Sequence, residues 1–241
     1  MNFQDKSVMI TGAGKGIGRD TARYLAARGA HIVAISRTRE SLDSLAKEIG
    51  CDVIVADLAN PDAARTAAIE GLPCDYLVNC AGINVLQPFV DVTVEAFDLV
   101  YAVNTRAAMI VAQEFARSLI DRQKSGAIVN VSSISSVVGF EDHASYCASK
   151  GAMDGMSRVM ANELGPHGIR VNCINPIVTM TELAAEAWSD PVKAGPVLSR
   201  MPVGRFAETR DVASVIAFLL SDEAAMLSGL ALPVDGGFLA N

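Results

Sequence analysis

The sequence has few of the residues that bind metals or form disulfides. Its 241 residues include three histidines, at positions 31, 143 and 167, and five cysteines with no Cys-x-x-Cys pair. No two histidines stand at a spacing typical of a metal site, and an odd number of cysteines does not make a disulfide framework. We therefore expect free thiols in a reducing compartment and no metal centre.

Long apolar runs and clusters of basic residues are also absent. No stretch approaches the ~20 apolar residues that a membrane-spanning helix needs. Lysine and arginine number 20 against 27 acidic residues, for a net charge of −7, and no basic run offers a surface to nucleic acid or to an anionic membrane. The N-terminal residues do not resemble a targeting signal. These absences predict a cytoplasmic protein that binds neither nucleic acid nor membrane.

Short apolar segments alternate with longer amphipathic ones along the whole chain. Hydrophobic residues make up 51% of the sequence, enough for one sizeable core. Seven short apolar segments predict strands, at 8–10, 31–35, 53–56, 76–78, 127–131, 170–174 and 230–233. Several of them are rich in Val and Ile without polar alternation, as expected of strands buried on both faces. Helices are predicted at 16–28, 39–49, 61–70, 93–122 with a bend near Asn104, 145–164 and 209–221.

This order predicts an α/β fold, a Rossmann-type doubly wound parallel sheet of about seven strands with helices on both faces. No change in composition marks a second domain, so we expect a single domain over residues 1–241. The stretch 176–204, rich in proline and glycine, is the one irregular insertion in this pattern. We expect it to cover a substrate.

A glycine-rich turn follows the first predicted strand and opens the first predicted helix. Residues 11–18 read TGAGKGIG, which differs from the general G-x-G-x-x-G fingerprint of dinucleotide sites. Glycines let the backbone turn tightly and let a pyrophosphate approach the amides of a helix N-terminus. Because a strand precedes the turn and a helix follows it, the turn predicts a dinucleotide site. Its predicted residues are Gly12, Lys15, Gly16, Ile17 and Gly18.

The end of the second predicted strand distinguishes NADP from NAD. An NAD enzyme usually carries an acidic residue there to bind the ribose 2′-hydroxyl. This chain has Ser36, Arg37 and Thr38, followed by Arg39, and no acid. A guanidinium and hydroxyls pair with a 2′-phosphate, and Lys15 adds a second cation. The sequence therefore favours NADP(H).

A serine, a tyrosine and a lysine form the candidate catalytic group. Tyr146 and Lys150 stand four apart at the start of a predicted helix, so they share a face. A nearby ammonium lowers the pKa of a phenol, which lets Tyr146 exchange a proton with a carbonyl or alcohol oxygen. Ser133 follows the fifth predicted strand, at the carboxyl edge of the sheet where ligands bind, and would hydrogen-bond that oxygen.

Together with Asn104 and the stretch Asn79-Cys-Ala-Gly82, these motifs resemble the short-chain dehydrogenase/reductase family over the whole chain. The resemblance implies hydride transfer between a nicotinamide and a carbonyl or alcohol. It implies that Lys150 also binds the nicotinamide ribose and that Asn104 holds a water on a proton path. It further implies a cofactor site that includes Asp57, Leu58, Asn79, Ala81, Gly82, Pro176, Val178 and Thr181. Two residues depart from the family pattern, Cys80 in place of asparagine and Ile177 in place of glycine.

Further stretches are similar to the tetrameric carbonyl reductases of this family. They imply reduction of a small polar ketone, a ketose or a dicarbonyl, and a homotetramer in which helices 93–122 and 145–164 form the dimer contacts. His143 and Trp188 would then contact substrate, although a capping histidine and a packing tryptophan explain them as well. Three alternatives stay open: a sugar-alcohol dehydrogenase, a 3-oxoacyl thioester reductase, and a non-catalytic NADP-binding sensor.

Overall fold

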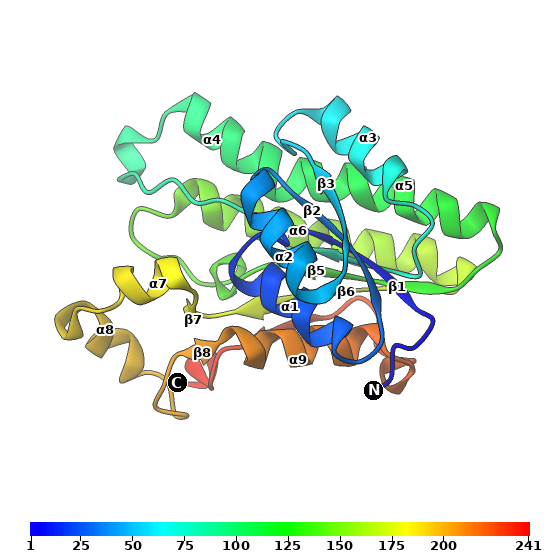
Figure 1. The fold of residues 1–241 in the computed structure, drawn as a ribbon. Helices are drawn as coiled ribbons and strands as arrows, with labels where there is room; N and C mark the ends of the chain where they lie inside the picture. Colours follow the sequence, from blue (N-terminus) through cyan, green and yellow to red (C-terminus); the bar gives the residue numbers. More distant parts are fainter.

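The computed structural model describes residues 1–241, apart from the side chains of Leu183 and Ala187. Seven parallel strands form the central sheet in the order β3-β2-β1-β4-β5-β6-β9 (Figure 1), which confirms the predicted fold class. Their bounds are β1 (Ser7–Thr11), β2 (His31–Ser36), β3 (Asp52–Val55), β4 (Tyr76–Asn79), β5 (Gly126–Val131), β6 (Ile169–Pro176) and β9 (Ala231–Val234).

Helices cover both faces of this sheet. On one face lie α1 (Gly16–Ala26), α2 (Arg39–Ile49) and α9 (Thr209–Leu220); on the other lie α3 (Pro61–Glu70), α5 (Ala107–Asp121) and α6 (Ala144–Leu164). Successive side chains of a strand point to opposite faces of the sheet. Neighbouring residues of each strand therefore pack against different helical layers. Thus Ile32 and Ala34 pack on the first layer, and Val33 and Ile35 pack on the second.

The predicted helix 93–122 is interrupted where a bend was expected. It consists of α4 (Val94–Tyr101), a π-helical turn at Ala102–Arg106, and α5. Single π-turns inside helices are rare overall, but those that occur are often found at functional sites. This turn holds the side chain of Asn104 inside the protein, where it is fully buried.

The prediction of an irregular segment over 176–204 is wrong in part. Two short helices lie there, α7 (Glu182–Ala187) and α8 (Pro191–Leu198), beside a pair of short strands, β7 (Thr179–Met180) and β8 (Ala207–Glu208). The helices begin at N-caps, where the hydroxyl of Thr181 and the carboxylate of Asp190 accept backbone N–H groups. Figure 1 shows both helices projecting from one end of the sheet.

No helix of the described residues combines the length and the apolarity that crossing a membrane requires. In the same part of the chain, no three side chains of His, Cys, Asp or Glu are grouped as a metal site would need. All five cysteines carry free thiols.

Candidate active site

The candidate site lies at the carboxyl ends of β1 and β4. The strand order reverses between these neighbours, and ligands of open α/β sheets bind at such a point. The hydroxyl of Thr11, the last residue of β1, accepts the backbone N–H groups of Cys80 and Ala81 at 3.1 and 3.2 Å. These hydrogen bonds fix the loop after β4 against the glycine turn after β1.

The glycine turn has the shape of a cradle for a phosphate. Gly12 and Gly16 have positive φ angles of 71° and 54°, and a Cβ atom on Gly16 would lie 2.9 Å from the Cγ2 atom of Thr181. No side chain caps the start of α1, and no acidic residue stands in its first turn. The turn therefore offers free amides, a helix N-terminus and the exposed Lys15 to an anion, which fits a pyrophosphate.

Residues 36–39 lie beside this turn. A Cβ atom on Gly14 would lie 2.8 Å from the hydroxyl oxygen of Ser36, so that serine closely approaches the glycines. Arg39 forms an ion pair of 3.0 Å with Asp43 on α2. Arg37 is exposed, and its guanidinium forms no ion pair with any described residue. Of the two arginines, Arg37 is therefore the one available to a 2′-phosphate.

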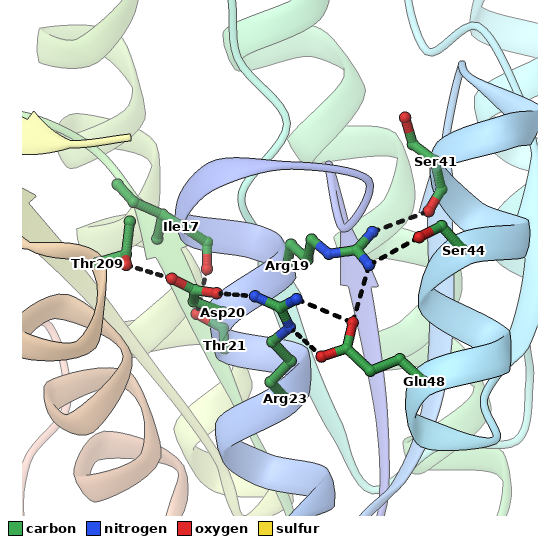
Figure 2. Close-up of polar contacts among 9 residues, drawn as sticks. All are labelled: Ile17, Arg19, Asp20, Thr21, Arg23, Ser41, Ser44, Glu48 and Thr209. Atoms are coloured by element: carbon green, nitrogen blue, oxygen red, sulfur yellow. Dashed lines mark hydrogen bonds and ion pairs between the residues drawn. The ribbon is translucent and has the colours of Figure 1, made fainter. Parts of the chain in front are cut away.

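A polar network fixes α1, which carries the glycine turn, to α2 and α9 (Figure 2). The guanidinium of Arg19 donates to the backbone oxygen of Ser41 at 3.0 Å and to the hydroxyl of Ser44 at 3.1 Å, and it pairs with Glu48 at 2.8 Å. Arg23 also pairs with Glu48, at 2.6 Å. Asp20 accepts a hydrogen bond from Thr209, the first residue of α9.

Ser133, Tyr146 and Lys150 come together at the same edge of the sheet. Lys150 is buried, and its ammonium donates to the backbone oxygen of Val131 at 2.7 Å and lies 5.5 Å from the centre of the Tyr146 ring. The hydroxyl of Ser133 lies 3.1 Å from that of Ser135. The helical face predicted for Tyr146 and Lys150 is the one that faces Ser133.

The ionisation of this group differs from the prediction. Burial raises the pKa of Tyr146 to about 12, although its hydrogen bond with Ser133 acts in the opposite direction. Burial also lowers the pKa of Lys150 to about 8. The hydrogen bond described for the ammonium of Lys150 goes to the backbone oxygen of Val131, and burial dominates the pKa of Tyr146. Tyr146 is therefore a neutral phenol near pH 7, a form that can donate a proton.

Asn104 fixes the loop that follows β4. Its amide nitrogen donates to the backbone oxygen of Ile83 and to the hydroxyl of Ser149, each at 3.0 Å, and its oxygen accepts the N–H of Ile83 at 2.8 Å. A Cβ atom on Gly82 would lie 3.5 Å from this oxygen and 3.7 Å from the nitrogen of Lys150. Gly82 thus lies between the π-turn and the lysine.

Residues 12–239 match the family model described as enoyl-(acyl carrier protein) reductase. The bovine L-xylulose reductase is 51% identical over 100% of this chain and 99% of its own. The chain belongs to the short-chain dehydrogenase/reductase family. It is accordingly an oxidoreductase that acts on CH–OH or C=O groups with a nicotinamide cofactor.

Two further members of the family show how far the similarity extends. The chicken D-erythrulose reductase is 48% identical, over 100% of this chain and 98% of its own. A structure from Agrobacterium tumefaciens, assigned as a 2-deoxy-D-gluconate 3-dehydrogenase with bound NADP, superimposes with a TM-score of 0.92 at 34% identity. That alignment covers 100% of this chain and 98% of the other.

Of the other cofactor residues expected from the family pattern, some lie at the ends of strands and others are buried. Asp57 is exposed after β3, Pro176 is the last residue of β6, and Val178 lies two positions further along the chain. Leu58 is buried. Asn79 is turned into the protein, where its amide nitrogen donates to Asn130 at 2.9 Å. In the structure, therefore, the side chains of Leu58 and Asn79 contact the protein interior.

The two residues predicted to contact substrate, His143 and Trp188, have different surroundings in the structure. The His143 ring hydrogen-bonds to the backbone oxygen of Glu141 and lies 6.1 Å from the Tyr146 ring. Trp188 packs edge-on against Phe206, with ring centres 5.5 Å apart, and the ammonium of Lys193 lies 4.8 Å from the centre of its ring. Trp188 therefore packs on the apolar cluster that includes Phe206 and residues of α8.

A buried polar pair beneath this site was not predicted from the sequence: Asp154 on α6 and Asn175 on β6. No motif marks these two residues. The only sequence signal is the position of Asp154, one helical turn beyond Lys150.

Proposed function

We propose that this protein is an NADP(H)-dependent carbonyl reductase that interconverts a small polar ketone, such as L-xylulose or diacetyl, and its alcohol. The observation that carries the proposal is the grouping of Ser133, Tyr146 and Lys150 beside the glycine turn. The names of the bovine and chicken relatives, both ketose reductases, support the substrate class.

The choice of NADP rests on the residues after β2. Ser36, Arg37 and Thr38 offer two hydroxyls and a guanidinium without an ion-pair partner in the described chain, and no carboxylate. Such a group attracts a 2′-phosphate, whereas the carboxylate of an NAD enzyme repels it. NADP bound in the Agrobacterium structure is in keeping with this choice.

Each member of the catalytic group has a separate task. NADPH, when bound, supplies the hydride. Ser133 donates a hydrogen bond to the ketone oxygen as negative charge develops there. Tyr146, a neutral phenol near pH 7, gives its proton to the same oxygen. Lys150 stabilises the phenolate that remains and binds the nicotinamide ribose, while Asn104 holds a water that returns the proton.

We assign the covering of the substrate to residues 176–204. The helix α8 and Trp188, which follows α7, pack on an apolar cluster that includes Ile134, Met201 and Phe238. Ile134 follows Ser133 directly, so the segment is connected to the catalytic group through packed side chains. His143 is our candidate for a contact with a substrate hydroxyl.

We assign a homotetramer in which α4, α5 and α6 meet their counterparts in other subunits. Apolar side chains are exposed on all three, among them Phe97, Leu99, Met109 and Val159. Exposed apolar patches of this kind mark association surfaces.

NADPH oxidation measured across a set of carbonyl compounds tests the proposed function. The set comprises L-xylulose, diacetyl, D-erythrulose and a 3-oxoacyl thioester, and polyols with NADP are run in the reverse direction. We expect ketoses and dicarbonyls to be the best substrates. Tyr146→Phe should lower turnover ~10²–10⁴-fold and leave nucleotide affinity nearly unchanged, because only the proton donor is lost.

Each of the alternatives has its own result in this assay. Preference for the thioester or for polyol oxidation would replace the proposed substrate class. Nucleotide binding without turnover of any compound would identify a sensor. Wild-type turnover by Tyr146→Phe would remove the assigned proton donor.

A further inference from the structure

A third polar side chain continues the face of α6 that carries the catalytic pair. Tyr146, Lys150 and Asp154 follow one another at intervals of four residues, so they lie along one side of the helix. Asp154 is only 6% exposed, and no ion pair joins it to any described side chain. A buried carboxylate costs free energy unless its surroundings compensate it, so this position requires a reason.

Asn175 connects this carboxylate to the catalytic serine. The amide nitrogen of Asn175 donates to Asp154 Oδ2 at 2.9 Å and to the backbone oxygen of Ser133 at 3.0 Å, and it lies 2.8 Å from the hydroxyl of Ser136. The carbonyl and the carboxylate can only accept hydrogen bonds. They therefore fix which way the amide faces. The carboxylate thus orients Asn175, and Asn175 holds the backbone of Ser133.

The carboxylate also influences Lys150. The ionisable groups that act on this ammonium are the thiols of Cys80 and Cys173 and the carboxylate of Asp154. Burial raises the pKa of both thiols to about 12, so both are neutral near pH 7. Asp154 is then the one negative group among them, and it favours the charged form of the lysine against the effect of burial.

We propose that Asp154 is a positioning residue for hydride transfer, which orients Ser133 through Asn175 and keeps Lys150 charged through its own negative charge. This inference rests on the proposed function. Lys150 in turn stabilises the Tyr146 phenolate, so the effect of Asp154 reaches the proton donor without contact with substrate.

The test compares Asp154→Asn with wild type in the reduction of L-xylulose, over a range of pH. Loss of the charge should move the alkaline limb of the kcat profile to lower pH by roughly 0.5–1 pH unit, because Lys150 loses its proton earlier. We expect kcat at neutral pH to fall about 10-fold or more, with the KM for NADPH within about 2-fold of wild type, because Asp154 lies beneath the catalytic group and away from the glycine turn.

Two variants separate orientation from charge. Asn175→Ala keeps the carboxylate but breaks the link to Ser133, so kcat should fall without a shift of the alkaline limb. Ser157→Ala is the matched control, because Ser157 is buried on the same helix and bonds to Asn130 and Cys173. Its profile should match wild type.

NMR titration of side-chain-labelled lysine gives a readout that needs no turnover. The pKa of Lys150 should be lower in Asp154→Asn than in wild type and unchanged in Ser157→Ala. An unchanged alkaline limb and an unchanged lysine titration would overturn the role of the charge. Wild-type kcat in Asn175→Ala would overturn the role in orientation, and this variant also decides the matter if Asp154→Asn does not fold. If the wild-type protein has no turnover, the proposed function is contradicted instead. The NMR titration would still show whether Asp154 raises the pKa of Lys150.

Discussion

Lys150 is buried in the protein, and burial disfavours the charged form of its side chain. Its side chain is 3% exposed, and a backbone oxygen accepts its hydrogen bond at 2.7 Å. The pKa of a lysine is ~10.4 in an unfolded chain, whereas the pKa of Lys150 in the folded protein is about 8. Folding at neutral pH therefore buries a charge at the expense of stability. Active sites commonly carry such a cost.

We predict that Lys150→Met abolishes turnover but raises the free energy of unfolding at pH 7. The lowered pKa corresponds to on the order of 3 kcal/mol, from which roughly 1.5 kcal/mol or more is subtracted for the lost hydrogen bond from the ammonium to Val131. Between pH 8 and ~10.4, folding of the wild type releases a proton, so its stability rises relative to the variant. Urea unfolding of both proteins at pH 7 and pH 10 measures this. A variant less stable than wild type at pH 7 would contradict the assigned cost.

A second prediction at this scale concerns Arg37. Arg37→Asp should exchange a guanidinium for a carboxylate next to Ser36 and Thr38, and so favour a ribose 2′-hydroxyl over a 2′-phosphate. We expect the ratio of NADPH to NADH affinity to reverse, as measured by fluorescence titration with each nucleotide. Arg39→Ala is the control, because Arg39 already pairs with Asp43. If wild type binds both nucleotides equally, the proposed choice of NADP is wrong.

At the scale of elements, the contacts of Arg19 attach α2 to the glycine turn. They hold the backbone of Ser41 in the first turn of α2, next to the residues assigned to the 2′-phosphate. Arg23 shares Glu48 with Arg19 but has no described hydrogen bond to Ser41 or Ser44 (Figure 2). Arg23 is therefore a suitable control for substitutions of Arg19.

We predict that Arg19→Met raises the KM for NADPH several-fold with little change in kcat, because the first turn of α2 loses its attachment. Arg23→Met should leave this KM within about 2-fold of wild type, since exposed ion pairs contribute ~0–1 kcal/mol. Steady-state kinetics with varied NADPH measures both. Equal effects of the two substitutions would show that the network stabilises the helices without positioning the nucleotide.

The elements of the sheet were predictable, and those of the segment 176–204 were not. Buried strands and amphipathic helices repeat with clear periods, and Gly50 ends α2 in the left-handed conformation as its position suggests. In α8, by contrast, Pro191, Gly195 and Pro196 conceal a helix of eight residues. The cap at Asp190 followed by Pro191 was the signal that could have found it.

At the scale of the whole molecule, many of the predicted site residues stand just after a strand or near the start of a helix. Their sequence context fixes where they lie, as for Ser133 after β5 and the glycines after β1. The pair Asp154 and Asn175 joins residues of two elements whose contact depends on how α6 packs on β6. No local pattern encodes such a contact.

The assigned tetramer gives a prediction at this scale. Phe97 and Tyr101 stack on α4 with ring centres 6.3 Å apart, and both are exposed. Replacement of both by glutamate should place charge in a subunit interface and yield a smaller species in light scattering. Val192→Glu on α8 is the control, since Val192 is also exposed but lies away from α4. An unchanged mass in the double variant would place any interface elsewhere.

The approach of Thr181 to Gly16 connects the glycine turn to the first turn of α7 across 165 positions of the chain. A dinucleotide seated on the turn would lie next to the N-cap of α7, in the segment to which we assign the covering of the substrate. On that assignment, we expect the nucleotide to bind first and the ketone second, and the alcohol to leave before the spent nucleotide. Initial-rate and product-inhibition patterns would reveal that order.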